Sequence, residues 1–140
     1  MTTDQWPRVL VGTSLSVAAY AASLVVAGPT ASRLFDALGF GMRSGTIPDG
    51  APRDHVLFVY GVLGSVLVGW MVLVAAVAAG PLRTQRAWAL RALALSVGTW
   101  FVLDTGFSLA VGSWQHAAFN LGFLAVLGIP LAGSRRSREG

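Results

Sequence analysis

The residues best suited to chemistry lie close together in one otherwise apolar stretch of the sequence. Asp104 and Ser108 are four residues apart, and His116 and Asn120 are also four apart. Each pair shares one face if its segment is helical. A turn near Gly112 would fold the two segments into an antiparallel hairpin. Counting outward from that turn predicts Asp104 opposite Asn120 and Ser108 opposite His116, at two matching depths.

An ionisable side chain in the middle of an apolar segment needs a partner or a function. Insertion of an aspartate near the centre of a membrane helix costs roughly 2.5 to 3.5 kcal/mol. Asp104 and His116 could act as a catalytic acid–base pair. The same cluster could equally be a polar clasp that holds two helices in register. The residues that could bind a ligand beside the pair are Asn120, Ser108, Thr105, His55, Tyr60 and Trp100.

The composition is that of a membrane protein. Of 140 residues, 54% are hydrophobic and 11% charged, with a mean hydropathy of +0.65, whereas soluble domains carry about 25% charged residues. The net charge of +4 does not indicate nucleic-acid binding, because the arginines lie at the ends of apolar runs. The absence of cysteine excludes disulfides, thiol redox chemistry and cysteine metal ligands.

Four apolar runs predict four transmembrane helices. About 20 apolar residues cross a hydrocarbon core of roughly 30 Å, and each run has this length. The first run could instead be a signal peptide, but it is long and its start is weakly basic, so we expect a retained helix. The predicted fold is all-α: an integral membrane antiparallel four-helix bundle in a single domain, 1–140. The spans are 9–27, 56–79, 87–111 and 114–132.

The arginines predict the orientation of these spans. Seven of the ten lie on the side that also holds both ends of the chain: Arg8, Arg83, Arg86, Arg91, Arg135, Arg136 and Arg138. Arginine and lysine accumulate on the cytoplasmic side of membrane proteins. We therefore expect a multi-pass protein of the cell membrane with both termini in the cytoplasm, and a cytoplasmic tail over 133–140.

The segment between the first two spans is predicted to contain a short helix, 30–39, lying in the outer interface. Its remainder, 41–53, is rich in Gly, Pro and Asp and is predicted to be irregular. Within the short helix we expect the apolar residues on one face and the charged residues away from that face. The apolar residues are Leu34, Phe35 and Leu38, and the charged ones are Arg33 and Asp36.

Small residues at spacing four predict where the helices approach one another, because close packing drives helix association in lipid. In the second span the pattern is Gly61, Ser65 and Gly69. The other spans offer Ala19, Ser23 and Ala27; Ala94 and Gly98; and Ala118 and Gly122. We expect these positions to line the contacts of a compact bundle.

The residues leave three functional readings open. The first is a non-catalytic accessory protein or a bundle that binds a lipophilic ligand. The second is a membrane enzyme, such as an isomerase, cyclase or hydrolase, using Asp104 and His116. The third is a haem protein with His55 and His116 as axial ligands. A proton-coupled transporter that uses Asp104 is a further alternative. For the first reading we expect no cofactor and no metal. The expected partners are the bilayer, a lipophilic molecule or another membrane protein, with a homo-oligomer as a further possibility.

The closing stretch, LDTGFSLAVGSWQHAAFNLGFLAVLGIPL (103–131), resembles the last hairpin of small four-helix bacterial integral membrane proteins of unknown function. The resemblance covers about a quarter of the chain. It implies the same bundle fold in a bacterial inner membrane and brings no activity. The positions that match are Asp104, Thr105, Ser108, Asn120, Pro130 and Leu131.

Overall fold

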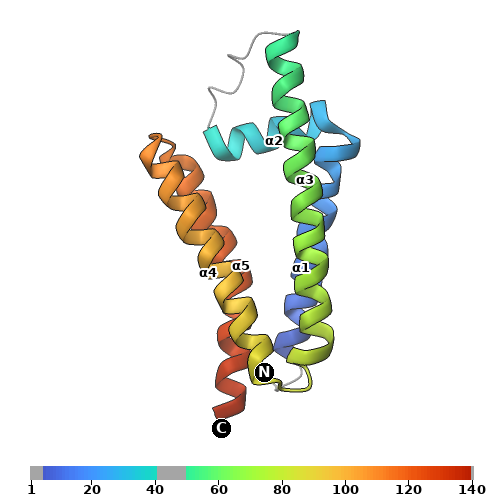
Figure 1. Ribbon diagram of the computed structural model, residues 1–140, viewed down its shortest axis with the longest axis vertical. Coiled ribbons are helices and arrows are strands. Elements are labelled where there is room, and N and C mark those ends of the chain that lie inside the picture. Colours follow the sequence, from blue (N-terminus) through green and yellow to red (C-terminus); the bar gives the residue numbers. More distant parts are fainter. Residues whose placement is uncertain (1–4, 41–49, 140) are drawn as a thin grey trace.

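The computed structural model describes residues 5–40 and 50–139, which fold almost entirely into helices (Figure 1). No strand occurs within these two ranges. A π-helical turn, η2 (Ala78–Leu82), extends the third helix around Pro81. The α-helices are α1 (Gln5–Val26), α2 (Gly28–Phe40), α3 (Ala51–Val77), α4 (Ala87–Ala110) and α5 (Trp114–Glu139).

Four of the helices, α1, α3 with η2, α4 and α5, are long and apolar enough to cross a membrane. The prediction of an all-helical chain with four segments of membrane-spanning length and composition is therefore confirmed. Several helices are longer than predicted, and the third and fifth differ most. The third begins at Ala51 rather than at 56, because Pro52 in its first turn suits a helix start. The fifth continues to Glu139 through the segment expected to be a tail. Residues 41–49 of the predicted irregular segment lie outside the described ranges.

Both termini lie at one end of the molecule, called here the terminal end (Figure 1). The helix α2 and the α4–α5 link lie at the opposite end, called the distal end, where α2 runs across α3. Gly112 has a φ of 77° in the α4–α5 link, in the region that favours glycine. The predicted turn at this residue is therefore confirmed.

The four long helices do not enclose a uniform core. α1 packs against α3 and α5, and α4 packs against α5, whereas direct contact between α3 and α4 is sparse. Buried side chains of all four helices meet toward the terminal end, and Leu10, Met71, Leu93 and Leu127 are at most 4% exposed. The distal halves of α3 and of the α4–α5 pair diverge (Figure 1). The packing therefore leaves an opening on the α3–α4 side.

A close backbone contact between α1 and α3 lies one residue away from a predicted pattern. A Cβ atom on Gly64 would lie 2.6 Å from the carbonyl oxygen of Ala21, so α1 and α3 need glycine here. A Cβ on Gly61 or Gly69 would meet nothing within 4 Å, and Ser65 is exposed. The prediction from the Gly61, Ser65 and Gly69 pattern was therefore wrong, because these residues face away from α1. All the buried residues of α3 together, and not its small residues alone, determine which side of the helix packs against α1.

Candidate functional site

A polar contact near the distal end joins α4 to α5. The imidazole Nε2 of His116 lies 3.5 Å from Oδ1 of Asp104, and their side chains are 17% and 33% exposed. The carboxylate thus has the interhelical partner that an acidic group in an apolar segment requires. The two residues proposed from the sequence as an acid–base pair are next to each other.

The predicted pairing across the hairpin was nevertheless wrong. Asn120, fully buried, donates from Nδ2 to the Thr105 hydroxyl at 3.2 Å rather than facing Asp104. Ser108 donates to the backbone carbonyl of Asp104 within its own helix, at 2.7 Å. Such bonds to the preceding turn are common for serine in helices. Across the link, His116 meets the carboxylate of Asp104 rather than the hydroxyl of Ser108.

Two residues expected to join the cluster lie elsewhere. The Tyr60 hydroxyl donates to the carboxylate of Asp36 on α2. His55 is an exposed residue near the start of α3, and no contact within the described residues joins it to His116. The haem reading required these two histidines to face each other, so the arrangement gives it no support.

A row of aromatic rings leads from the cluster toward the middle of the molecule. The His116 ring lies 6.0 Å from Phe119, which lies 6.3 Å from Phe123. Phe123 meets Trp100 edge-on at 5.0 Å, and Trp100 lies 5.8 Å from Trp70 of α3. Trp100, expected from the sequence to take part in binding, lies between Phe123 and Trp70 in this row. Phe119, Phe123 and Trp70 were not expected to take part.

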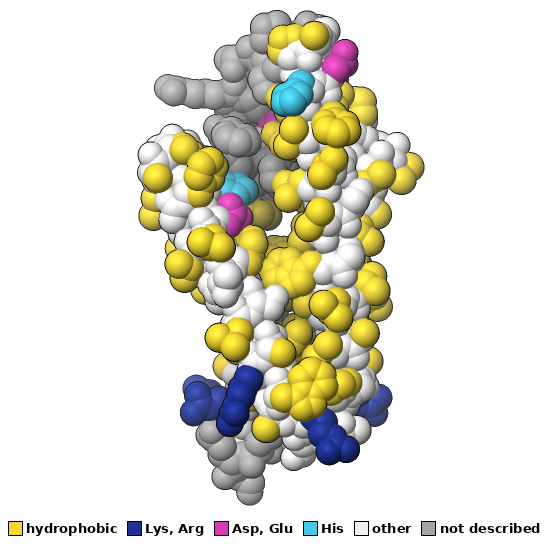
Figure 2. Space-filling model, in the orientation of Figure 1, with side chains coloured by type: hydrophobic (Ala, Val, Ile, Leu, Met, Phe, Trp, Pro, Cys, Tyr) yellow, Lys and Arg dark blue, Asp and Glu magenta, His cyan; other side chains and the backbone are white. Residues whose placement is uncertain are grey.

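Two of these rings, Trp70 and Trp100, line a cleft between α3 and α4 with a volume of about 560 Å³. Its walls are mainly apolar and include Leu63, Leu67, Thr99 and Leu103. The indole of Trp70 donates to the Ser96 hydroxyl at 2.9 Å and so bridges the two walls. Figure 2 shows the hollow between the helices, with hydrophobic side chains on both sides and an acidic and a histidine side chain at its rim.

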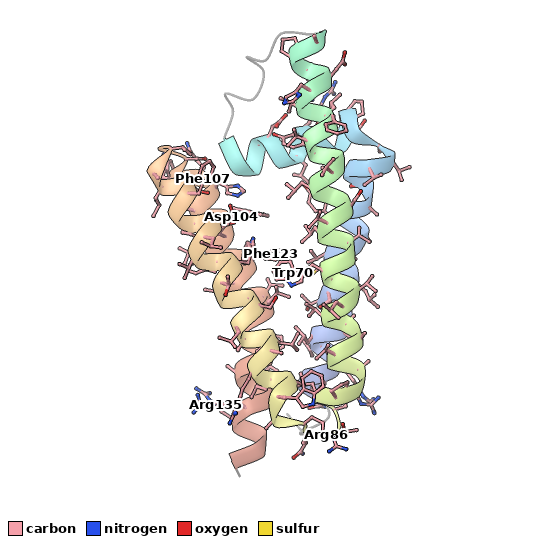
Figure 3. All side chains as sticks on the ribbon, in the orientation of Figure 1. Trp70, Arg86, Asp104, Phe107, Phe123 and Arg135 are labelled. Carbon is pink, nitrogen blue, oxygen red and sulfur yellow. The ribbon has the colours of Figure 1, made fainter. Side chains whose placement is uncertain are left out.

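The view with side chains shows how the cleft and the cluster are related. Asp104 and Phe123 lie on the side of the α4–α5 pair that faces α3, and Trp70 projects toward this side from α3 (Figure 3). Leu103 lines the cleft and directly precedes Asp104 in α4. A molecule in the cleft would therefore have apolar walls along most of its length and a carboxylate and an imidazole near its distal end.

A second polar group fixes α2 over the distal end. Asp36 is 3% exposed and its Oδ2 lies 3.3 Å from Nη1 of Arg53. Nη2 of the same guanidinium donates to the Ser32 hydroxyl at 2.7 Å. Asp36 is thus buried toward α3, while Leu34 is 52% exposed. The partners on α3 compensate the buried charge, and hydropathy alone does not reveal them.

The site thus combines a carboxylate, an imidazole, an amide and hydroxyl groups beside an apolar cleft, a set that can orient a polar group or move a proton. Among the described residues, no three of the types His, Cys, Asp and Glu come together as a metal site. Comparison of the chain with protein families, curated protein sequences and solved structures found no match.

Proposed function

We propose that this protein binds a lipophilic molecule in the α3–α4 cleft, with the polar end of that molecule at Asp104 and His116. The observation that carries the proposal is the continuity between the two regions. The aromatic row runs from Trp70 in the cleft wall to His116 in the cluster, with ring centroids 5.0–6.3 Å apart. Binding sites for small molecules combine apolar walls with a few polar groups in this way.

The position of the cleft favours a ligand that arrives from the bilayer. Helices α3 and α4 are two of the four apolar segments, and the cleft lies between them where their contact is sparse. Its sides carry large exposed apolar residues, among them Leu63 at 42% and Leu103 at 67%. A hydrocarbon chain could enter between the helices without passing through water.

The polar groups favour a head group that donates a hydrogen bond. The Asp104 carboxylate only accepts hydrogen bonds when ionised. Asn120 lies on the same face of α5 as His116, one turn farther from the link. Its side-chain oxygen is buried without a hydrogen-bond partner among the described residues. A lipophilic alcohol, phenol or amine would satisfy these acceptors, so we propose this class of ligand.

The proposal includes a membrane arrangement. The four long helices form an antiparallel bundle in a bacterial cell membrane, with α2 in the outer interface and both termini in the cytoplasm. Its support is the distribution of charge: seven arginines against Asp4 and Glu139 at the terminal end, and three arginines against three aspartates in the segment between α1 and the apolar part of α3. The cluster would then lie in the outer half of the membrane.

A saturable probe of the proposed class tests the binding function. We expect 11-bromoundecanol, a lipophilic alcohol whose bromine quenches indole fluorescence, to quench the purified protein saturably through Trp70 and Trp100. Thr99→Phe should fill the cleft and abolish the saturable component. Val102→Phe is the matched control, because Val102 is 67% exposed on the same helix and does not line the cleft. Unsaturable quenching, or equal quenching in both variants, would contradict the proposal.

Acid–base catalysis on the bound molecule is a second candidate, favoured by the 3.5 Å contact between His116 and Asp104. An imidazole and a carboxylate at this separation can relay a proton at the polar end of a substrate. Mass spectrometry of compounds extracted from the purified protein separates the two candidates. A wild-type extract that contains a product, with only its precursor in Asp104→Asn, indicates catalysis. The same compound in both indicates binding alone.

A further inference from the structure

A second groove lies between α4 and α5 at the terminal end, away from the α3–α4 cleft. It has a volume of about 660 Å³, and its floor is made by apolar and small residues of both helices. Ala94 and Gly98 contribute from α4, and Gly128 and Leu131 from α5. A Cβ on Gly98 or on Gly128 would meet nothing within 4 Å, so the glycines leave open space rather than a helix contact. The groove is therefore wide enough for a chain of atoms from outside the protein.

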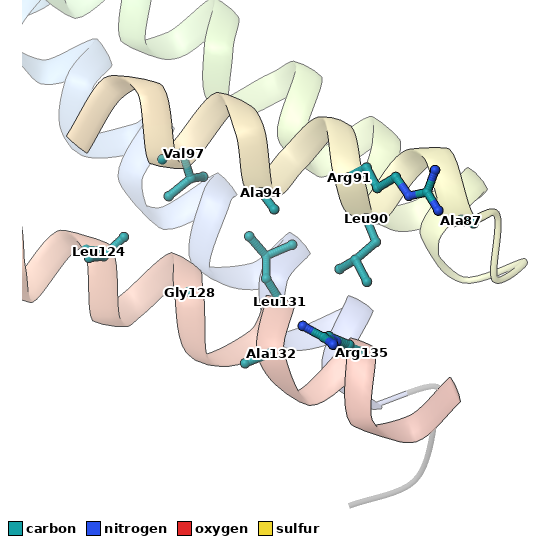
Figure 4. A pocket seen from close by; sticks show the side chains of 11 residues that line it. Ala87, Leu90, Arg91, Ala94, Val97, Leu124, Gly128, Leu131, Ala132 and Arg135 are labelled. Atoms are coloured by element: carbon teal, nitrogen blue, oxygen red, sulfur yellow. The ribbon is translucent and has the colours of Figure 1, made fainter. Parts of the chain in front are cut away.

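Two arginines lie at the rim of this groove nearest the terminal end, one from each helix (Figure 4). Arg91 lies in the second turn of α4, and Arg135 lies near the end of α5; both are exposed. Gly98 lies seven residues along α4 from Arg91, which corresponds to roughly 10 Å. The groove thus has two positive charges at one end and an apolar floor extending from them into the membrane-spanning part.

We propose that this groove binds an anionic phospholipid, with the phosphate between Arg91 and Arg135 and an acyl chain along Ala94, Gly98 and Gly128. Guanidinium groups bind phosphate oxygens through paired N–H donors. Basic pockets between transmembrane helices are typical sites for anionic lipid head groups. The charged rim and the apolar floor match the order of head group and tail in a phospholipid.

The charges also decide between a lipid and a second copy of the chain. Two copies meeting through the same groove would bring four guanidinium groups together at the rim, and like charges repel strongly away from water. The terminal end as a whole carries seven arginines against two acidic residues, and basic side chains gather there in Figure 2. An anionic lipid is attracted to this end, whereas an identical surface is not.

Native mass spectrometry of the full chain in detergent tests the head-group contact. Phosphatidylglycerol and phosphatidylcholine with identical acyl chains are added in equal amounts, and the ratio of the two bound lipids is measured. We expect a preference for phosphatidylglycerol that falls about fivefold for each of Arg91→Gln and Arg135→Gln. Arg136→Gln is the matched control, an exposed neighbour that does not line the groove.

The acyl-chain contact has its own pair of variants. Gly128→Leu should fill the groove and lower binding of both lipids, whereas Gly122→Leu should leave binding unchanged. Both glycines belong to α5 and have open space at Cβ, but Gly122 does not line the groove. Equal binding of the two lipids by wild type, an equal loss in Arg136→Gln, or a dimer that Gly128→Leu dissolves would overturn the proposal. Arg91 makes no ion pair with a described residue, so Arg91→Gln remains informative if Arg135→Gln fails to fold.

Discussion

The Tyr60 hydroxyl of α3 donates a hydrogen bond to the buried carboxylate of Asp36 in α2, joining residues 24 positions apart in the sequence. Arg53, about two turns earlier in α3, contacts the other oxygen of the same carboxylate. The short helix is thus attached to α3 by a charge and a hydroxyl group, both near the distal end. This attachment holds α2 against α3 at the distal end.

Removal of the Tyr60 hydroxyl should loosen α2 without disturbing the long helices. Hydrogen bonds to charged groups contribute about 1.5 to 3 kcal/mol, and Asp36 would retain Arg53 as a partner. We therefore expect Tyr60→Phe to lower the free energy of unfolding by about 1.5 kcal/mol. The loss should be greater for Arg53→Gln, which leaves a buried carboxylate without its cation.

Thermal unfolding in detergent and hydrogen exchange measure these two effects. Exchange should rise in α2 in both variants and stay unchanged in α4. Arg33→Gln provides the control, since Arg33 is an exposed arginine of α2 itself. Exchange that rises equally in all five α-helices would show that the contact supports the whole fold rather than the position of α2.

The close approach of α1 and α3 at Gly64 predicts a sharp difference between two glycines of one helix. The added methyl of Gly64→Ala would lie 2.6 Å from the backbone oxygen of Ala21, which cannot move without its helix. Overpacking of this kind costs about 1 to 3 kcal/mol. Gly61→Ala adds the same methyl group where nothing lies within 4 Å. We expect a lower unfolding temperature for the first variant only, and equal temperatures would contradict the contact.

A third glycine, Gly133 of α5, packs closely against an aromatic ring of α1 at the terminal end. A Cβ on Gly133 of α5 would lie 2.3 Å from the indole ring of Trp6 in α1. Because the obstacle is a side chain, its removal should relieve the clash. Gly133→Ala should therefore destabilise the protein in the presence of Trp6 and have a smaller effect in a Trp6→Ala background. A double-mutant cycle on unfolding free energies gives this coupling directly, and additive effects would exclude the contact.

The sequence predicts the four long helices because each contains a mainly apolar run of membrane length, and only the third of these runs includes charged residues, Arg91 and Asp104. It also indicates the polar hairpin, since Asp104 and His116 stand out among apolar neighbours on either side of a glycine turn. It does not reveal which polar residue meets which across the link. That pairing depends on the rotation of each helix, and Ser108 changes the available partners by bonding to its own backbone.

Other features depend on contacts between segments far apart in the chain. The inward position of Asp36 depends on Arg53, 17 residues away, so the composition of α2 alone does not indicate that this carboxylate is buried. The α3–α4 cleft follows from the order in which helices pack around α1. Hydropathy carries no information on that order, because all four helices are apolar on most sides. Trp70 and Phe123 are therefore recognisable as parts of the site only in three dimensions.

The observed pairing across the hairpin gives a prediction that the sequence alone could not. If His116 interacts with Asp104, and Asn120 with Thr105, energetic coupling should appear within these two pairs and be absent between Asp104 and Asn120. Polar contacts between membrane helices contribute about 0.6 kcal/mol on average, so each coupling should be of that size. Three double-mutant cycles on unfolding, built from Asp104→Asn, His116→Ala, Asn120→Ala and Thr105→Val, measure the three couplings. If the coupling between Asp104 and Asn120 were the largest of the three, the pairing predicted by counting from Gly112 would be correct. The contact between His116 and the Asp104 carboxylate would then be excluded.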